Sequence, residues 1–260
     1  MKDFIGTLAR MYEVNWATSI TEMPETRYSY QKAAAKTWAF VQARPDETSL
    51  REWDINLTSG NASTSILMGY ATGEYGPGPF RFVSSAAALT NVLTPAQSRL
   101  ASKANGGTFT GPSGTAQRSL VAGTTTPTII ADQIPVIPGK PITATVDAAG
   151  PTILEMDFRT ITGARVGTLK KIEADGVLAQ RISGTVPVVP ATARYLQIRA
   201  TGFTSLAFPQ VTYTPYVVPW AVGAGATSVV VDSVKREIIR TQKKSHDTFW
   251  RVSAKIVEVG

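Results

Sequence analysis

The feature that most constrains the fold is a series of short apolar or alternating runs, each of strand length, between about residues 108 and 215. Glycine, proline or Asp-Gly steps separate the runs, as at Pro138-Gly139 and Asp175-Gly176. Several short strands at this spacing are typical of a β-sandwich, and we expect one of jelly-roll type. The runs cover residues 129–131, 141–146, 152–158, 179–186, 195–200 and 206–213.

The composition favours a nearly all-β chain. Of the 260 residues, 33 are Thr and 18 are Ser, while 21 Gly and 16 Pro supply turns. Strong helix formers gather mainly within residues 28–41, in the segment Lys32-Ala33-Ala34-Ala35-Lys36. We therefore expect an all-β fold with one short helix in this stretch.

The residue types exclude several kinds of chemistry. The chain has no cysteine, which excludes disulfides, zinc–thiolate sites and thiol catalysis. Its single histidine, His246, excludes multi-histidine metal sites. A catalytic triad with His246 and Asp247 lacks a Gly-x-Ser-x-Gly elbow, and the surrounding run is polar, so we expect His246 to lie in a surface loop. No cofactor or metal is expected.

The net charge is +7, and the basic residues are scattered along the chain. This charge permits an acidic partner but does not predict specific nucleic-acid binding. The N-terminal residues contain no apolar stretch of signal-peptide length, and no window approaches the about 20 apolar residues of a membrane span. We expect a chain that is made in the cytoplasm and has no membrane span.

Two strands and a loop are expected in the first hundred residues. In the run 51–58, Trp53, Ile55 and Leu57 alternate with polar residues, as in a half-buried strand. Residues 66–70 predict the next short strand. The segment 73–83 begins with three glycines and two prolines in seven residues, which excludes a helix or a central strand. We expect it to be either a loop that places Phe80 in the core or a subunit contact, and we favour the first.

The C-terminal residues predict three more strands, at 227–232, 237–240 and 250–259. These strands need a partner, because an isolated hairpin is marginally stable in water. We therefore expect residues 1–105 together with 216–260 to form one β domain, and residues 106–215 to form a jelly-roll domain.

Three segments of the first domain carry a resemblance. They are Trp53-Asp54-Ile55-Asn56-Leu57, Gly73-Glu74-Tyr75-Gly76-Pro77-Gly78-Pro79-Phe80-Arg81-Phe82-Val83 and Asn91-Val92-Leu93-Thr94-Pro95. This order resembles the N-terminal part of minor tail proteins of long-tailed, siphovirus-type bacteriophages. It is most similar to distal tail proteins, which close the tail tube and begin the tip. The resemblance implies a strand-rich tail domain.

The segment 120–215 carries a second resemblance, to carbohydrate-binding jelly-roll modules. Its residues 138–143, 154–163 and 188–199 look like the first strand, the central strand with its turn, and the Pro-Ala-x-Ala strand of such modules. These modules occur in glycan-degrading enzymes and on phage tails. The sugar-stacking aromatics and calcium-binding acids of the family are not placed here by motif.

Two polar clusters each allow two interpretations. Glu155 and Asp157 share one face of a predicted strand, and glycosidases use two acids about 5–9.5 Å apart. We instead expect both acids on the solvent face of a strand with Leu154, Met156 and Phe158 inside. A basic cluster near the C-terminus suits nucleic-acid contact, a solvated strand edge or a surface that faces another subunit, and we expect the edge. It comprises Lys235, Arg236, Arg240, Lys243 and Lys244, near Phe249 and Trp250.

The resemblances imply a structural, non-enzymatic virion protein at the distal end or tip of the phage tail tube. We expect it to form a ring, a hexamer in preference to a trimer, and to contact tube, tip or tape-measure proteins. The N-terminal domain has more large aromatic residues than one small sandwich needs inside, and such residues are usual at interfaces. The candidate interface residues are Tyr75, Pro77, Pro79, Phe80 and Phe82.

A glycan-binding module that attaches the particle to a host surface glycan is the alternative function, and a glycoside hydrolase is a third. Exposed Tyr and Trp on one sandwich face would favour glycan binding. A large apolar patch on the N-terminal domain would favour assembly.

Overall fold

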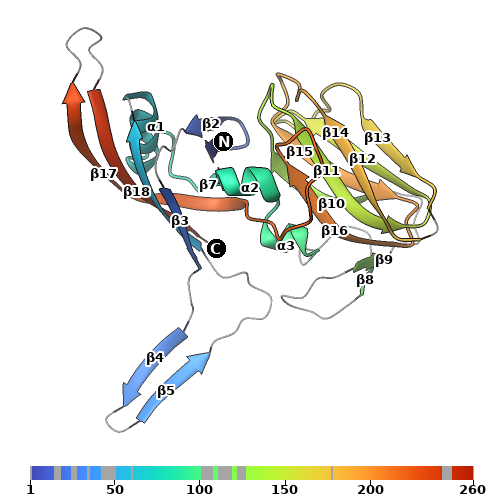
Figure 1. The fold of residues 1–260 in the computed structure, drawn as a ribbon, viewed down its shortest axis with the longest axis horizontal. Helices are drawn as coiled ribbons and strands as arrows, with labels where there is room; N and C mark the ends of the chain where they lie inside the picture. The colour runs from blue at the N-terminus through green and yellow to red at the C-terminus, as the bar shows by residue number, and fades with distance from the viewer. Residues whose placement is uncertain are drawn as a thin grey trace. The chain divides into compact units, whose positions relative to one another are not determined.

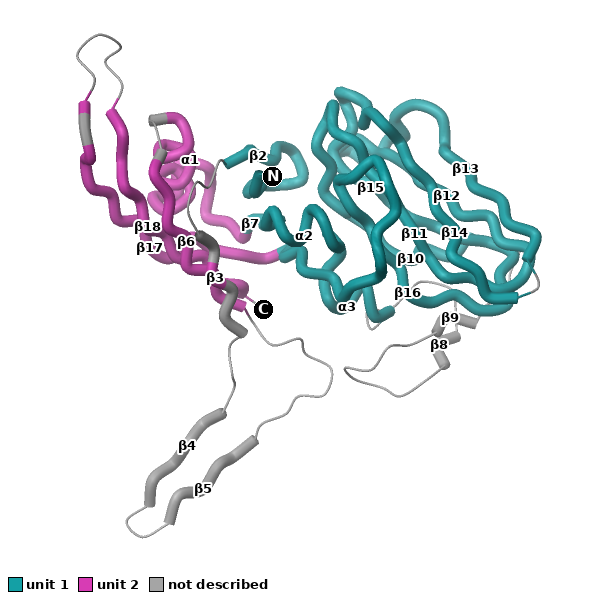
Figure 2. The backbone as a smooth tube through the Cα atoms, viewed as in Figure 1, with its two compact units in different colours: residues 1–14, 80–227 teal, residues 15–79, 228–260 magenta. Residues whose placement is uncertain are grey.

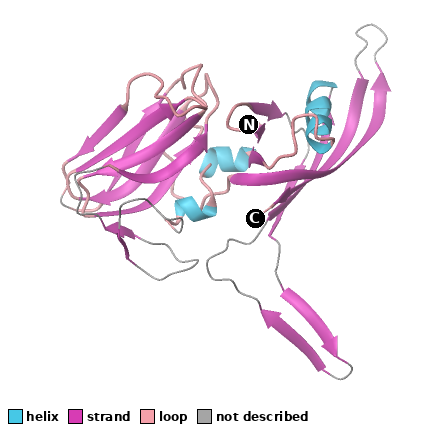
Figure 3. Ribbon diagram, turned by 180° about the vertical axis from the view of Figure 1, so that it is seen from behind, coloured by secondary structure: helices cyan, strands magenta, loops and turns pink. Residues whose placement is uncertain are grey.

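The structure is a computed structural model, and it describes residues 2–14, 19–24, 28–33, 36–41, 51–59, 61–100, 108–110, 119–121, 127–176, 178–241 and 248–259. The chain forms two compact units, each from two separate stretches (Figure 2). Unit 1 comprises residues 1–14 and 80–227, and unit 2 comprises residues 15–79 and 228–260. Antiparallel strands predominate (Figure 3), which confirms the expected all-β class.

Most of unit 1 is a β-sandwich (Figure 1). One sheet has the strand order β10-β15-β12-β13, and the other has the order β14-β11-β16-β9-β8. The strands are β8 (Thr108–Thr110), β9 (Ser119–Val121), β10 (Thr128–Pro135), β11 (Ile142–Ala149), β12 (Thr152–Arg159), β13 (Lys170–Ala174), β14 (Gln180–Val186), β15 (Tyr195–Thr201) and β16 (Ser205–Thr212). All six expected runs are strands. The jelly-roll type stays a prediction.

The sandwich core follows from alternation along its strands. Leu154, Met156 and Phe158 of β12 are buried, and so are Leu196 and Ile198 of the neighbouring β15. Successive side chains of a strand point to opposite faces, so these residues fill one side of the sheet. One continuous cluster of buried apolar residues includes members of both sheets.

The rest of unit 1 packs on this core. It comprises β1 (Asp3–Gly6), β2 (Met11–Val14), β7 (Phe80–Val83), α2 (Ser85–Thr90) and α3 (Pro95–Ser98). β1 pairs antiparallel with both β2 and β7. The side chain of Ser84 caps α2 by accepting from the Ala87 amide at 3.1 Å, and Thr94 forms a capping box with Gln97 at the start of α3.

Asn91 joins three segments of unit 1. Its side chain is fully buried, and its Oδ1 accepts from the amides of Leu93 (3.2 Å) and Val211 (3.1 Å). Its Nδ2 donates to the carbonyl of Ala221 at 2.8 Å. A Cβ at Gly225 would collide with the carbonyl oxygen of Val92, so the returning chain approaches residues 91–94 as closely as only glycine allows. The chain that enters the sandwich and the chain that leaves it are therefore bonded together.

These contacts explain why the compact units differ from the expected domains, 1–105 with 216–260 and 106–215. Phe4, Val83, Val92, Leu93 and Leu100 belong to the same buried cluster as the sandwich residues. Residues 80–100 and the chain to residue 227 consequently group with the sandwich.

Unit 2 is built around four neighbouring strands in the order β17-β18-β6-β3. The strands are β3 (Ser19–Pro24), β6 (Arg51–Ser59), β17 (Ala226–Thr241) and β18 (Thr248–Glu258). The pairs β17–β18, β18–β6 and β6–β3 are antiparallel, and α1 (Asn61–Ala71) contacts β18 and β6. Arg51, at the start of β6, forms a bidentate ion pair with Glu258, at the end of the neighbouring β18. Its Nε and Nη2 donate to Oε2 (2.9 Å) and Oε1 (3.1 Å) of Glu258.

Two expected elements of unit 2 are wrong. In the stretch expected to hold a helix, 28–41, the described residues form two paired strands, β4 (Tyr28–Ala33) and β5 (Lys36–Val41). The Tyr, Trp and Phe residues of these strands have high strand propensity, which outweighs the helix propensity of the alanines. Residues 66–70 are not a strand but part of α1. Thr64, Leu67 and Tyr70 are buried at helical spacing, which a short apolar run does not reveal.

The expected strand at 51–58 is confirmed as β6, and the one at 250–259 as β18. The expected strands at 227–232 and 237–240 are one continuous strand, β17, with irregular pairing between Val231 and Ser233. Within the described residues, the helices are too short or too polar to cross a membrane.

Candidate functional site

The loop that follows α1 holds three of the five candidate interface residues. The Tyr75 ring lies 4.9 Å from the Tyr70 ring, and a Cβ at Gly69 would collide with it. Tyr75 is therefore packed on α1, with 37% of its surface exposed. Pro77 and Pro79 are exposed. This loop presents two prolines and one edge of a tyrosine ring to solvent.

The other two candidates lie in β7. Phe80 and Phe82 are buried within the chain, at 3% and 1% exposure. Phe82 pairs with Ile5 of β1. The loop thus places Phe80 in the core, which was the favoured interpretation, and neither phenylalanine is available to another subunit.

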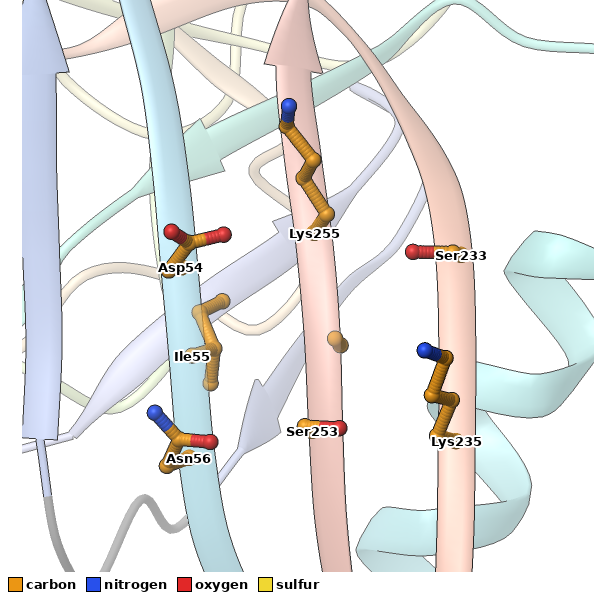
Figure 4. A pocket seen from close by; sticks show the side chains of 8 residues that line it. Asp54, Ile55, Asn56, Ser233, Lys235, Ser253 and Lys255 are labelled. Carbon is orange, nitrogen blue, oxygen red and sulfur yellow. The ribbon is translucent and has the colours of Figure 1, made fainter.

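One face of the unit 2 sheet is apolar and the other is polar. Trp53, Ile55 and Leu57 are buried, as expected from their alternation along β6. Asp54 and Asn56 point the opposite way, to the face shown in Figure 4. There a shallow groove of about 330 Å³ crosses three strands. Its lining residues are Asp54, Ile55, Asn56, Ser233, Lys235, Ser253, Ala254 and Lys255.

The charges around this groove largely neutralise one another. Lys255 forms an ion pair of 2.8 Å with Glu52, and Arg251 lies 3.5 Å from Glu237 on the same face. The hydrogen bond to Glu52, together with the charges of Glu52, Asp54 and Asp232, raises the pKa of Lys255 above its ordinary value. The groove therefore combines hydroxyl, amide and mixed charged groups without an excess of positive charge.

The two acids of β12 occupy a different environment from the expected one. Glu155 and Asp157 are 6% and 0% exposed, so the expectation of a solvent face is wrong. They point away from Leu154 and Met156, but arginine side chains cover them. A strand face that reads as polar in the sequence is thus buried by long charged side chains rather than by another element.

Asp157 is held by hydrogen bonds from two arginines. Arg159 donates to its Oδ2 from Nε (3.2 Å) and Nη2 (2.7 Å), while Arg165 donates from Nε to Oδ1 (2.9 Å) and from Nη2 to Oδ2 (3.4 Å). Burial acts to raise the pKa of Asp157, but the hydrogen bonds and charges of Arg165 and Arg159 outweigh it and lower that pKa. Asp157 is therefore a carboxylate, and it ties the turn that carries Arg165 to β12.

Glu155 is held by ion pairs instead, and its Oε2 accepts no hydrogen bond from the described residues. Arg199 of β15 lies 2.9 Å from its Oε2, and Lys171 of β13 lies 3.5 Å from its Oε1. A glycosidase general acid needs a raised pKa and access to the substrate. These two acids are covered by cations, and the pKa of Asp157 is lowered, so the cluster suits a structural or charge-presenting role.

The sequence did not indicate these arginines as partners of the two acids. Arg159 is the last residue of β12 and Arg165 lies in the turn after it, whereas Arg199 comes from a strand more than forty residues after the two acids. The pairing of Glu155 with Arg199 follows from the β12–β15 register, which a single sequence does not reveal.

Of the basic cluster near the C-terminus, the described side chains lie on β17. Lys235 and Arg236 are exposed, and the Arg236 guanidinium lies 4.8 Å from the Trp250 ring centroid. Lys243, Lys244 and His246 lie outside the described residues. In the described part of the chain, no group of three or more His, Asp or Glu side chains is placed to hold a metal ion.

An aromatic segment follows the last sandwich strand. Tyr216 and Val217 are 56% and 47% exposed. Trp220 is half-buried, with its ring 5.0 Å from that of Phe208 and its Nε1 donating to the Pro209 carbonyl at 3.3 Å. This segment presents an exposed tyrosine and a fixed tryptophan.

Comparison of the chain with known protein families, with curated proteins and with solved structures found no match.

Proposed function

We propose that the chain is a structural, non-enzymatic component of a phage tail, at the distal end or tip of the tail tube, and that it acts by assembling into a ring. The proposal rests first on the resemblance of the segments 53–57, 73–83 and 91–95 to distal tail proteins. It places the protein in the virion, in contact with tube, tip or tape-measure proteins.

The observation that best supports assembly is exposed apolar surface on the unit 2 sheet. Ile238 and Ile239, near the end of β17, are 58% and 45% exposed. Large exposed apolar side chains suit contact with another chain. β17 is an inner strand of its sheet, whereas β3 is an edge strand that can pair with another chain. Contact between these two different surfaces is head-to-tail, and such contacts close into a ring when the rotation fits.

The exposed isoleucines of β17 change the set of residues that we assign to the subunit interface. Pro77, Pro79, Ile238 and Ile239 are exposed, whereas Phe80 and Phe82 are not. We therefore assign the contact to the exposed set. A hexamer remains preferred over a trimer because the resemblance is to proteins that continue a tube.

The test compares two substitutions of exposed apolar residues. Ile238→Glu places a charge on the proposed contact, while Leu178→Glu places one at an 82% exposed site in unit 1. We expect tails built with the Ile238→Glu chain to lose the distal ring, and tails built with Leu178→Glu to be normal. Equal incorporation of both variants, measured by electron microscopy and by the subunit content of purified tails, would refute the assembly proposal.

A second candidate function is binding of a host surface glycan by unit 1. The exposed Tyr216 and the fixed Trp220 favour it, because sugar rings stack on aromatic side chains. Tyr216→Ala should then abolish adsorption of the protein to host cell walls without changing its melting temperature. Unchanged adsorption would eliminate this candidate.

A further inference from the structure

A second surface of unit 1, on β12, β13 and β15, carries an excess of positive charge. Around the carboxylates of Glu155 and Asp157 lie four cations, those of Arg159, Arg165, Arg199 and Lys171. Glu173 of β13 lies on the same side by register, so after pairing this arginine–lysine face retains one positive charge. The adjoining residues Gln197 and Thr201 of β15 share this side of the sheet by register.

The four cations of this face differ in exposure. The Arg159 and Arg199 side chains are 24% and 17% exposed, whereas Arg165 and Lys171 are 46% and 53% exposed. Arg165 and Lys171 are therefore the cations that a dissolved anion meets first.

The spacing of these two cations is fixed by the strand. Arg165 is anchored on Asp157 and Lys171 on Glu155, two residues apart on β12. Residues i and i+2 of a strand lie about 7 Å apart and on one face. Because the carboxylates hold both cations in place, little side-chain freedom is left to lose when an anion binds.

We propose that this face binds a carboxylate-bearing polysaccharide, with the sugar carboxylates at Arg165 and Lys171. The planar guanidinium of arginine matches a carboxylate in geometry and forms strong charge-assisted hydrogen bonds with it. The hydroxyls of Thr160 and Thr162, in the turn that carries Arg165, are exposed or half-buried and bonded to each other at 2.9 Å, and the exposed Thr162 hydroxyl can also bond a sugar hydroxyl. The proposal does not depend on ring assembly, and it uses a different part of unit 1 from Tyr216 and Trp220.

Nucleic acid fits this face less well than an acidic sugar chain. One excess charge allows few phosphate contacts, and affinity for DNA at physiological salt depends on many. The described aromatic on this side of β15 is Tyr195, which is half-buried. A stacking platform for bases needs several exposed rings.

The test is calorimetric titration of the full chain with polygalacturonate, using dextran as the uncharged polymer. Replacing both outer cations, in Arg165→Gln/Lys171→Gln, should weaken binding about tenfold, a loss of roughly 1.4 kcal/mol. The matched control is Lys235→Gln/Arg251→Gln, which removes the same charge from exposed positions of unit 2 and should change affinity less than about twofold. If the first variant unfolds, Lys171→Gln alone replaces it, because Glu155 keeps Arg199.

Four results would overturn the proposal. They are no binding of polygalacturonate in 50 mM salt, equal weakening by the control variant, equal affinity for dextran, and equal or tighter binding of a polyphosphate or a DNA duplex of matched charge. The last result would make the face a general polyanion surface. The supporting result is that polygalacturonate binds more tightly than the other polymers, and that only replacement of Arg165 and Lys171 weakens this binding.

Discussion

Replacing Asp157 with asparagine tests whether the buried carboxylate holds its part of the sandwich together. The substitution keeps the shape of the side chain and removes its charge. Four hydrogen bonds from Arg159 and Arg165 then lose their charged acceptor, and Arg199, 3.6 Å away, loses an opposite charge. The guanidinium groups of Arg159 and Arg165 then remain close together without the negative charge that balanced them.

The expected loss of unfolding free energy is about 3 kcal/mol. Breaking a buried ion pair by removing one partner costs about 3–5 kcal/mol. The lower end applies because the Arg159 and Arg165 side chains are 24% and 46% exposed and regain water when the carboxylate is gone. For a unit of this size, 1 kcal/mol corresponds to about 3 °C, so the melting temperature of unit 1 should fall by about 9 °C.

Urea unfolding of the full chain at pH 7, followed by circular dichroism, measures this change. The control is Glu173→Gln, which removes an exposed acid from the neighbouring strand β13 and should cost less than about 0.5 kcal/mol. A cost below about 1 kcal/mol for Asp157→Asn would refute the reasoning.

The difference in unfolding free energy between wild type and Asp157→Asn should depend on pH. Because the pKa of Asp157 is lowered in the folded state, its stabilisation is fully present above the ordinary aspartate pKa of about 3.9. This stabilisation is lost as the pH falls through the lowered value. The difference between wild type and Asp157→Asn should therefore shrink below about pH 4, and a constant difference down to pH 2 would contradict the assignment.

Three further predictions follow from particular contacts. Burial, partly opposed by the hydrogen bond from the Ser85 amide, raises the pKa of Asp3 to about 6. The free energy of unfolding of the wild type should therefore fall by about 3 kcal/mol as the pH rises from about 4 to about 6. Urea unfolding of Asp3→Asn should show no such fall. Gly69→Ala should destabilise the wild type by about 1 kcal/mol because its Cβ displaces the Tyr75 ring, yet stabilise a Tyr75→Ala chain by a similar amount through helix propensity, as a double-mutant cycle would reveal. A fragment of residues 106–215 should melt at a lower temperature than one of residues 80–227, because Leu93 and Leu100 belong to the sandwich core; equal melting temperatures would favour the shorter domain.

The parts of the fold that the sequence predicts are those encoded in local alternation. Trp53, Ile55 and Leu57 indicate β6 because every second residue is buried. In contrast, β13 was not expected, since Lys170, Lys171 and Glu173 give it the composition of a solvated segment. It forms a strand because it pairs with β12, and its charged side chains suit the edge of a sheet.

The helix α1 and the arginine–carboxylate cluster could not be predicted, for two different reasons. α1 has an apolar run too short to distinguish a strand from a buried helix turn. The cluster depends on register, because Glu155 meets Arg199 only when β12 and β15 align as they do. Asn91 was singled out within a tail-protein-like segment, but its bonds to Val211 and Ala221 depend on chain segments more than a hundred residues away.

The bonding around Asn91 determines how mechanical load passes through unit 1. A pull applied at residues 80 and 227 reaches the hydrogen bonds that join residues 91–93 to Ala221, Ala224 and Gly225 before it reaches the sandwich strands. Force then runs across this short bridge, and the roughly hundred residues between its two sides carry little of it. The sandwich can therefore be lengthened, exchanged or decorated by evolution without altering the path of tension along the rest of the chain.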